Sequence, residues 1–155
     1  MKNHIDRMQT KRISNLDLTK KCPRSPKARL ANFVILARMI DKCGASLAGT
    51  IGEYEFGCEL DRFLLDWKGI SVSAFEEYVR EGHTEDDVVK WVKSTGIPKA
   101  DGEIAEWSNK METYKYDNDE EGREWLNGGI AELGLSPKAT LFDYLEADDA
   151  SSFSK

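Results

Sequence analysis

The feature of this sequence that most limits its fold is a repeated spacing of apolar side chains at three and four residues, which marks one face of an α-helix. The spacing occurs once between residues 26 and 47 and in six further stretches after residue 56. No part of the chain alternates strand patterns with helix patterns, and no internal repeat has a fixed period. We therefore predict a mainly α fold, a single compact domain of about seven helices over residues 17–155.

Residues that begin or end helices accompany most of these stretches. Ser25-Pro26 predicts the start of the first helix, because serine is a good N-cap and proline is tolerated in the first turn. The apolar face of this helix would run from Leu30 to Leu47, and Gly69 would stop the helix that follows it. Start signals of later helices, several of them capping boxes, are predicted at Ser73, Thr84, Asp101, Asp117 and Thr140.

Two regions depart from the helical pattern. Residues 47–57 combine Gly49 and Gly52, which permit turns, with residues that favour extended backbone, and they predict a small β element or an ordered loop. The polar tail from Ala147 to Lys155 is predicted to fray. The tryptophans fall one to a helix and are predicted to anchor the core; they are Trp67, Trp91, Trp107 and Trp125.

Charge is divided unevenly along the chain. The net charge is −6 at pH 7, but residues 1–30 carry +7 and residues 31–155 carry −13. Residues 1–16 have little apolar content and are predicted to form a flexible basic arm. Because the acidic body repels phosphate, the sequence does not favour nucleic acid as a partner. The basic segment of residues 1–30 is instead predicted to lie on an acidic face of its own body or of a neighbour.

Three features predict a cytoplasmic location and no membrane association. The first fifteen residues lack the apolar segment of a signal peptide. The longest apolar run, from Phe33 to Ala37, is far shorter than the ~20 residues of a membrane-spanning helix. The cysteines, Cys22, Cys43 and Cys58, are odd in number, which is typical of reduced thiols rather than of a disulfide framework.

Most catalytic and metal-binding patterns are absent from the sequence. Its two histidines, His4 and His83, lie in no nucleophile motif, and the cysteine spacings of 21 and 15 residues do not resemble a zinc site. The acidic run at 117–122 imitates a calcium loop, but Gly128 occupies the twelfth position, where a glutamate ligand is required. We therefore predict no cofactor, no metal and no catalytic residue.

The stretch from Gly52 to Asp66 is the richest in groups that could carry chemistry. It places acidic side chains among Tyr54, Phe56 and Cys58, and two carboxylates beside aromatic walls could perform acid–base catalysis. The alternative is structural, since Asp61 could also cap a helix. The acidic residues are Glu53, Glu55, Glu59, Asp61 and Asp66.

An ordered series of motifs also resembles a known family. The chain has D-L-x-x-x-x-P-R-S-P at 17–26, R-M-I-D-K at 38–42 and L-A-G-T-x-G-E-Y at 47–54. A fourth motif at 58–70 begins C-x-L-D-x-F-L and ends G-I. Together they resemble a family of small bacterial proteins known as a domain of unknown function, in which proline often stands where this chain has Glu59. The resemblance implies a bacterial, intracellular, single-domain protein and brings no reaction, cofactor or catalytic residue.

The sequence as a whole favours a non-catalytic cytoplasmic module that binds a protein or a small molecule. One alternative is a small cofactor-free enzyme that uses Cys58 and the carboxylates of residues 53–66. Another is a nucleic-acid-binding accessory protein that acts through its basic arm. The predicted binding surface joins the loop at 49–62 to the basic segment at 20–29, and its candidate residues are Arg24, Arg29, Tyr54, Glu55, Cys58, Asp61 and Arg62.

Overall fold

The fold is that of a computed structural model, which describes Ile13 and residues 16–153. The predicted basic arm lies outside the described residues, apart from Ile13 and Leu16. Seven helices are described, and the mainly α prediction is confirmed. They are α2 (Leu36–Ala48), α3 (Glu59–Lys68), α4 (Val72–Arg80), α5 (Glu85–Ser94), α6 (Asp101–Glu112), α7 (Glu120–Glu132) and α8 (Leu141–Phe153).

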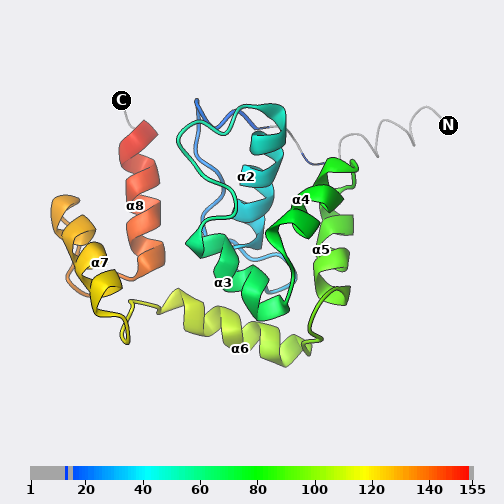
Figure 1. The fold of residues 1–155 in the computed structure, drawn as a ribbon. Coiled ribbons are helices and arrows are strands. Elements are labelled where there is room, and N and C mark those ends of the chain that lie inside the picture. The colour runs from blue at the N-terminus through cyan, green and yellow to red at the C-terminus, as the bar shows by residue number, and fades with distance from the viewer. Residues whose placement is uncertain (1–12, 14–15, 154–155) are drawn as a thin grey trace.

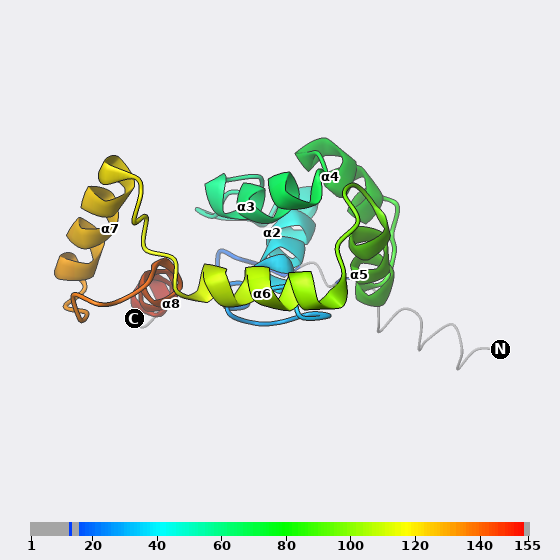
Figure 2. The ribbon, with the colours of Figure 1, turned by 90° about the horizontal axis from the view of Figure 1, so that it is seen from below.

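Helix α2 stands in the middle of the molecule and contacts α3 and α4 (Figure 1). The pair α4 and α5 lies on one side of it, and α7 and α8, which contact each other, lie on the other. Helix α6 runs between these two sides, as the view from below shows (Figure 2). The candidate site lies on the side of α2 where α7 and α8 are found, next to the start of α3.

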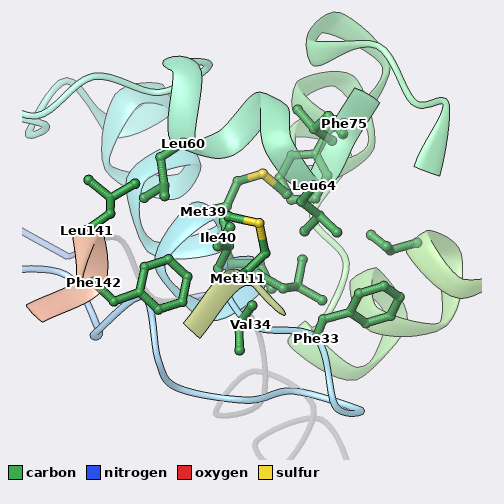
Figure 3. Packing of buried hydrophobic residues seen from close by; sticks show 14 of the residues in the cluster. Phe33, Val34, Met39, Ile40, Leu60, Leu64, Phe75, Met111, Leu141 and Phe142 are labelled. Atoms are coloured by element: carbon green, nitrogen blue, oxygen red, sulfur yellow. The ribbon is translucent and has the colours of Figure 1, made fainter. Parts of the chain in front are cut away.

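The core forms where the segment leading into α2 meets the other helices (Figure 3). Residues 33–36 are four consecutive apolar side chains with no exposed surface, and Met39 and Ile40 continue the core along α2. Phe75 of α4 and Phe142 of α8 are also fully buried. Because the same core includes residues from α2 through α8, the helices form one packed unit.

Several predicted helix ends are confirmed by hydrogen bonds. The Thr84 and Thr140 hydroxyls each accept a bond from the backbone N–H three residues on, and the Asp87 and Asp143 carboxylates accept from the backbone N–H of Thr84 and Thr140. Gly69 ends α3 in the left-handed conformation, with φ of 70°. The start predicted at Ser73 is wrong by two residues, because the cap of α4 is Ser71.

The predicted start of the first helix at Pro26 is wrong. Ala31 and Asn32 have φ of 49° and 70°, and they form a tight turn that pairs Leu30 with Phe33. Ile35 also has positive φ, so α2 begins only at Leu36. The apolar residues 33–35 are fully buried in an irregular segment before α2, and a spacing rule for one helical face does not detect that arrangement.

The two regions predicted to depart from the helical pattern, residues 47–57 and the tail from Ala147, have different structures. Helix α2 continues to Ala48, and residues 49–58 form a loop without strands, which confirms the loop alternative. The prediction of a frayed tail is wrong for residues 147–153, which belong to α8, and residues 154–155 lie outside the described residues. The aromatic ring of Phe153 stacks on that of Tyr54 at a centroid distance of 6.5 Å, and Asp149 is buried. Contacts with distant residues therefore stabilise a helix whose own sequence is polar.

Candidate functional site

The candidate residues predicted from sequence divide into three groups. Arg24, Tyr54 and Asp61 enter ion pairs or hydrogen bonds around α2, and Cys58 joins them while also lining a cavity. Arg29 lies elsewhere and bonds Glu112 and Asn109 of α6. The third group, Glu55 and Arg62, is exposed to solvent. The structure thus brings four of the seven residues to the environment of one helix.

The first polar cluster around α2 consists of Lys42, Asp61 and Cys58. The Lys42 side chain is 3% exposed, and its Nζ lies 3.0 Å from Oδ1 of the fully buried Asp61 carboxylate. The same ammonium group donates a hydrogen bond of 3.3 Å to the Cys58 sulfur. The other Asp61 oxygen accepts from the Gly57 backbone N–H at 2.8 Å. This cluster fixes the loop end and the start of α3 against α2.

The second polar cluster joins α2 to α8 and to the loop. Arg38 donates two hydrogen bonds to the Asp149 carboxylate, at 2.7 and 3.1 Å, and Tyr54 donates a third at 2.8 Å. Burial opposes the charge of Arg38, but the Asp149 carboxylate outweighs it and raises the pKa of the guanidinium. Burial and the neighbouring Asp149 also raise the pKa of the Tyr54 hydroxyl, which stays protonated as the donor.

The basic segment before α2 pairs with the acidic body. Arg24 bonds Asp41 of α2 and also Glu85 at the start of α5. Lys27 contacts the carboxylates of Asp143 and Glu146 on α8 at 2.7 and 3.0 Å. These ion pairs agree with the expectation that the positive charge near the N-terminus lies on acidic faces of the same chain.

A cavity of about 500 Å³ opens beside the first cluster, between the start of α3, the start of α7 and the side of α8. Its apolar lining is Leu60, Trp125, Leu141 and Leu145, and its polar lining is Cys58, Glu59, Tyr116, Asp119 and Glu121, with Gly122 at the start of α7. A second cavity of about 480 Å³ is lined by Tyr54 and Phe153 and mainly by polar residues. The first cavity has the larger share of apolar side chains.

Aromatic rings form one wall of the first cavity. Tyr116 and Trp125 meet at 83° with centroids 6.3 Å apart, and Trp125 meets Tyr144 at 76°. The Tyr116 hydroxyl donates to Glu59 at 2.7 Å, and burial together with that carboxylate raises the pKa of Tyr116. Trp125 is 54% exposed, so the prediction that it anchors the core is wrong. It forms the open edge of the cavity instead.

Comparison with known families identifies the family of this chain. The model of a domain of unknown function, DUF5069, matches residues 20–151. The chain belongs to the DUF5069 family. A search of curated proteins found no match.

The motifs noted in the sequence of this DUF5069 chain contribute to the two polar clusters and to the ion pair between Arg24 and Asp41. The motifs supply polar contacts to or from α2, and Tyr54 of the third motif donates a hydrogen bond to Asp149 of α8. Their contributions are Arg24 from the first, Arg38, Asp41 and Lys42 from the second, Tyr54 from the third, and Cys58 and Asp61 from the fourth. The motifs therefore describe how the loop, α3 and α8 are attached to α2, and this attachment shapes the walls of the cavity.

Sequence reasoning missed most of the cavity lining of this DUF5069 chain. Of the seven candidate residues only Cys58 lines it, together with its neighbours Glu59 and Leu60 from the predicted loop, whereas Tyr116 and Trp125 lie more than fifty residues later in the chain. The acidic run at 117–121 was visible in the sequence, but its position beside the start of α3 depends on tertiary packing. Over the described residues, no group of three His, Cys, Asp or Glu side chains is arranged to hold a metal ion. No helix in the same part of the chain is long and apolar enough to cross a bilayer.

The three cysteines of this family member have different environments. Cys22 is exposed, Cys58 is half-buried at the cavity, and Cys43 of α2 has no exposed surface. Burial, with smaller contributions from Glu76 and Asp61, raises the pKa of the Cys43 thiol to about 12. The folded protein therefore retains the Cys43 proton at a pH where an unfolded chain would release it.

This difference predicts a loss of stability at alkaline pH. Above pH ~9 the thiol ionises in the unfolded chain only, so it lowers the free energy of unfolding by up to about 1.4 kcal/mol per pH unit until the folded thiol also ionises. We expect Cys43→Ala to remove this part of the slope in urea unfolding between pH 9 and about 11. Equal slopes for Cys43→Ala and the wild type would contradict the assigned burial.

Proposed function

We propose that this protein is a non-catalytic module that binds a small molecule in the cavity between α3, α7 and α8. The observation that supports the proposal best is the cavity itself. Its volume of about 500 Å³ lies within the range of small-molecule sites, and it combines apolar walls with a few polar groups, as such sites do. The reduced thiols, all free, fit the cytoplasmic location predicted from the sequence, which is part of this proposal.

The attachment of the cavity walls to α2 supports a preformed site. Lys42 and Asp61 hold the start of α3, and Arg38 holds Asp149 on α8, so the two buried ion pairs secure elements on both sides of the cavity. A site whose walls are already ordered loses less conformational entropy when a ligand binds.

The alternative enzyme has less support from the arrangement of its carboxylates. Catalysis by Glu55, Asp61 and Cys58 requires these groups to face one substrate. Asp61 is fully buried and engaged by Lys42 and Gly57, whereas Glu55 is exposed. The nucleic-acid alternative depends on the arm outside the described residues, because Arg24, Lys27 and Arg29 already pair with acidic side chains.

A fragment screen tests the proposed site. Saturation-transfer NMR on the full chain should identify small molecules that bind the wild type and lose binding at least tenfold in Trp125→Ala, by the loss of an aromatic contact worth about 1.4 kcal/mol or more. Ile97→Ala is the matched control, because Ile97 is 48% exposed and does not line the cavity. Fragments that bind both variants equally would place any binding elsewhere and contradict the proposal.

A further inference from the structure

The charge of the cavity lining is strongly one-sided. Glu59, Asp119 and Glu121 contribute three carboxylates, and among the residues that the structure describes, no lysine or arginine lines the cavity. The first turns of α3 and α7 bring positive helix dipoles to the same place, each equivalent to about half an elementary charge. Three carboxylates and two such dipoles leave the lining with a net charge of about −2.

The nearest buried cation does not cancel this negative charge. Lys42 does not line the cavity, and its ammonium lies 3.3 Å from the sulfur of Cys58, which does. Its charge is already balanced by the Asp61 carboxylate at 3.0 Å, which is fully buried and does not line the cavity. The Lys42–Asp61 ion pair therefore adds little net charge to the cavity. An anionic ligand would be repelled by the carboxylates that line the cavity, and no lysine or arginine of the described residues lines it to offset them.

The aromatic wall adds a second and independent preference for a cation. Tyr116 and Trp125 line the cavity with their rings at 83°. The faces of aromatic rings attract ammonium groups within about 6 Å of the ring centre, and rings set at an angle to one another can surround a quaternary ammonium group from several sides. Trp125, whose indole attracts cations best, is 54% exposed, whereas Tyr116 is 6% exposed, so Trp125 offers most of the accessible ring surface.

We propose that the cavity binds an organic cation, a quaternary ammonium or an amine with a compact apolar body. This inference rests on the proposed function and names its ligand class. The apolar body would contact Leu60, Leu141 and Leu145, while the cationic head would lie between the aromatic wall and the carboxylates. The same charges exclude phosphates and simple carboxylates as ligands of this cavity.

Three probes of one shape and different charge test the inference. They are choline, its neutral carbon analogue 3,3-dimethylbutan-1-ol, and the anion 3,3-dimethylbutanoate. Each is titrated into the ¹⁵N-labelled full chain, and amide shifts are followed for the residues around the cavity. We expect choline to bind at least tenfold more tightly than the neutral alcohol, and the anion to produce no shift there.

Two glutamates of α7 provide a matched pair of variants. Glu121 lines the cavity, whereas Glu124 is exposed on the same helix and does not line it. Glu121→Gln should weaken choline binding about three- to tenfold and leave the neutral alcohol unchanged. Glu124→Gln removes the same charge from the same helix, and we expect it to change choline affinity less than twofold.

The outcomes separate this inference from the proposed function. If the neutral alcohol binds as tightly as choline, or if both glutamate variants behave alike, the cation preference is wrong while the cavity remains a ligand site. If choline does not bind but the fragment screen finds Trp125-dependent ligands, the inference also fails alone. If neither choline nor any fragment depends on Trp125, the proposed function fails with it.

Discussion

Lys42→Met is expected to lower the free energy of unfolding by about 3–5 kcal/mol. The substitution removes the ammonium but leaves the Asp61 carboxylate fully buried, with only the Gly57 N–H as a donor. An unpaired buried charge is far more costly than the loss of a surface ion pair. Since domains of this kind have a total stability of ~5–15 kcal/mol, the variant should have a strongly reduced urea midpoint.

A second substitution and a surface control make this result specific. Adding Asp61→Asn to Lys42→Met removes the stranded charge and retains an acceptor for Gly57, so a large part of the loss should be recovered. Lys20→Met should cost less than about 1 kcal/mol, because Lys20 is 82% exposed beside Asp17. If Lys42→Met and Lys20→Met have the same urea midpoint, Lys42 is not buried against Asp61.

Arg38→Met is expected to destabilise α8 more strongly than the other helices. Without the guanidinium, Asp149 retains only the Tyr54 hydroxyl as a partner, and the buried carboxylate can reach water if the last turns of α8 open. The cost is at most about 3–5 kcal/mol, the price of leaving a buried charge unpaired. Opening of the last turns of α8 lets the Asp149 carboxylate reach water at a lower cost than global unfolding. We therefore expect the loss of stability to appear first as faster exchange of the amide hydrogens near Asp149.

Hydrogen exchange measured by mass spectrometry distinguishes this local effect from global unfolding. Peptides that cover residues 146–153 should exchange at least tenfold faster in Arg38→Met, while peptides from α4 and α5 should change less. Arg80→Met is a suitable control, because Arg80 is exposed and its ion-pair partners among the described residues are Glu76 and Glu77 on its own helix. Unchanged exchange at 146–153 would contradict the attachment of α8 through Arg38.

Local signals explain which helix ends could be predicted. Thr84 with Asp87 and Thr140 with Asp143 form capping boxes from residues three apart, so sequence spacing alone is sufficient to find them. Gly69 ends α3 because glycine adopts the left-handed conformation without strain. In each case the determining contact lies within one turn of the helix.

The errors occur where distant contacts decide the structure. Ser25, predicted to cap a helix, donates instead to Glu146 of α8 at 2.6 Å, a residue 121 positions away. Asn32, predicted to be helical, forms part of a turn, and its carbonyl accepts from the Ser108 hydroxyl of α6. The polar tail is helical because Asp149 pairs with Arg38. No short-range pattern contains these partners.

The candidate site was predictable only where neighbours in the sequence indicate it. Cys58 lies close in sequence to the aromatic and acidic residues that drew attention to it, and it does line the cavity. Trp125 follows a helical apolar pattern that is typical of core residues, yet its ring projects to the open edge, 54% exposed. The spacing of apolar residues predicts which residues share one face of a helix. Whether the face of α7 that carries Trp125 is covered depends on how α7 packs against α8.

The most direct test of the cavity as a ligand site uses the four tryptophans as reporters. The chain is labelled with 5-fluorotryptophan, and the Trp125 resonance is assigned by its absence in Trp125→Phe. Choline and 3,3-dimethylbutan-1-ol are then titrated separately and followed by ¹⁹F NMR. We predict that the Trp125 resonance shifts in a saturable manner, more strongly at low choline concentration, while the resonances of Trp67, Trp91 and Trp107 do not move. An unmoved Trp125 resonance with both probes, or equal shifts at all four positions, would contradict the account.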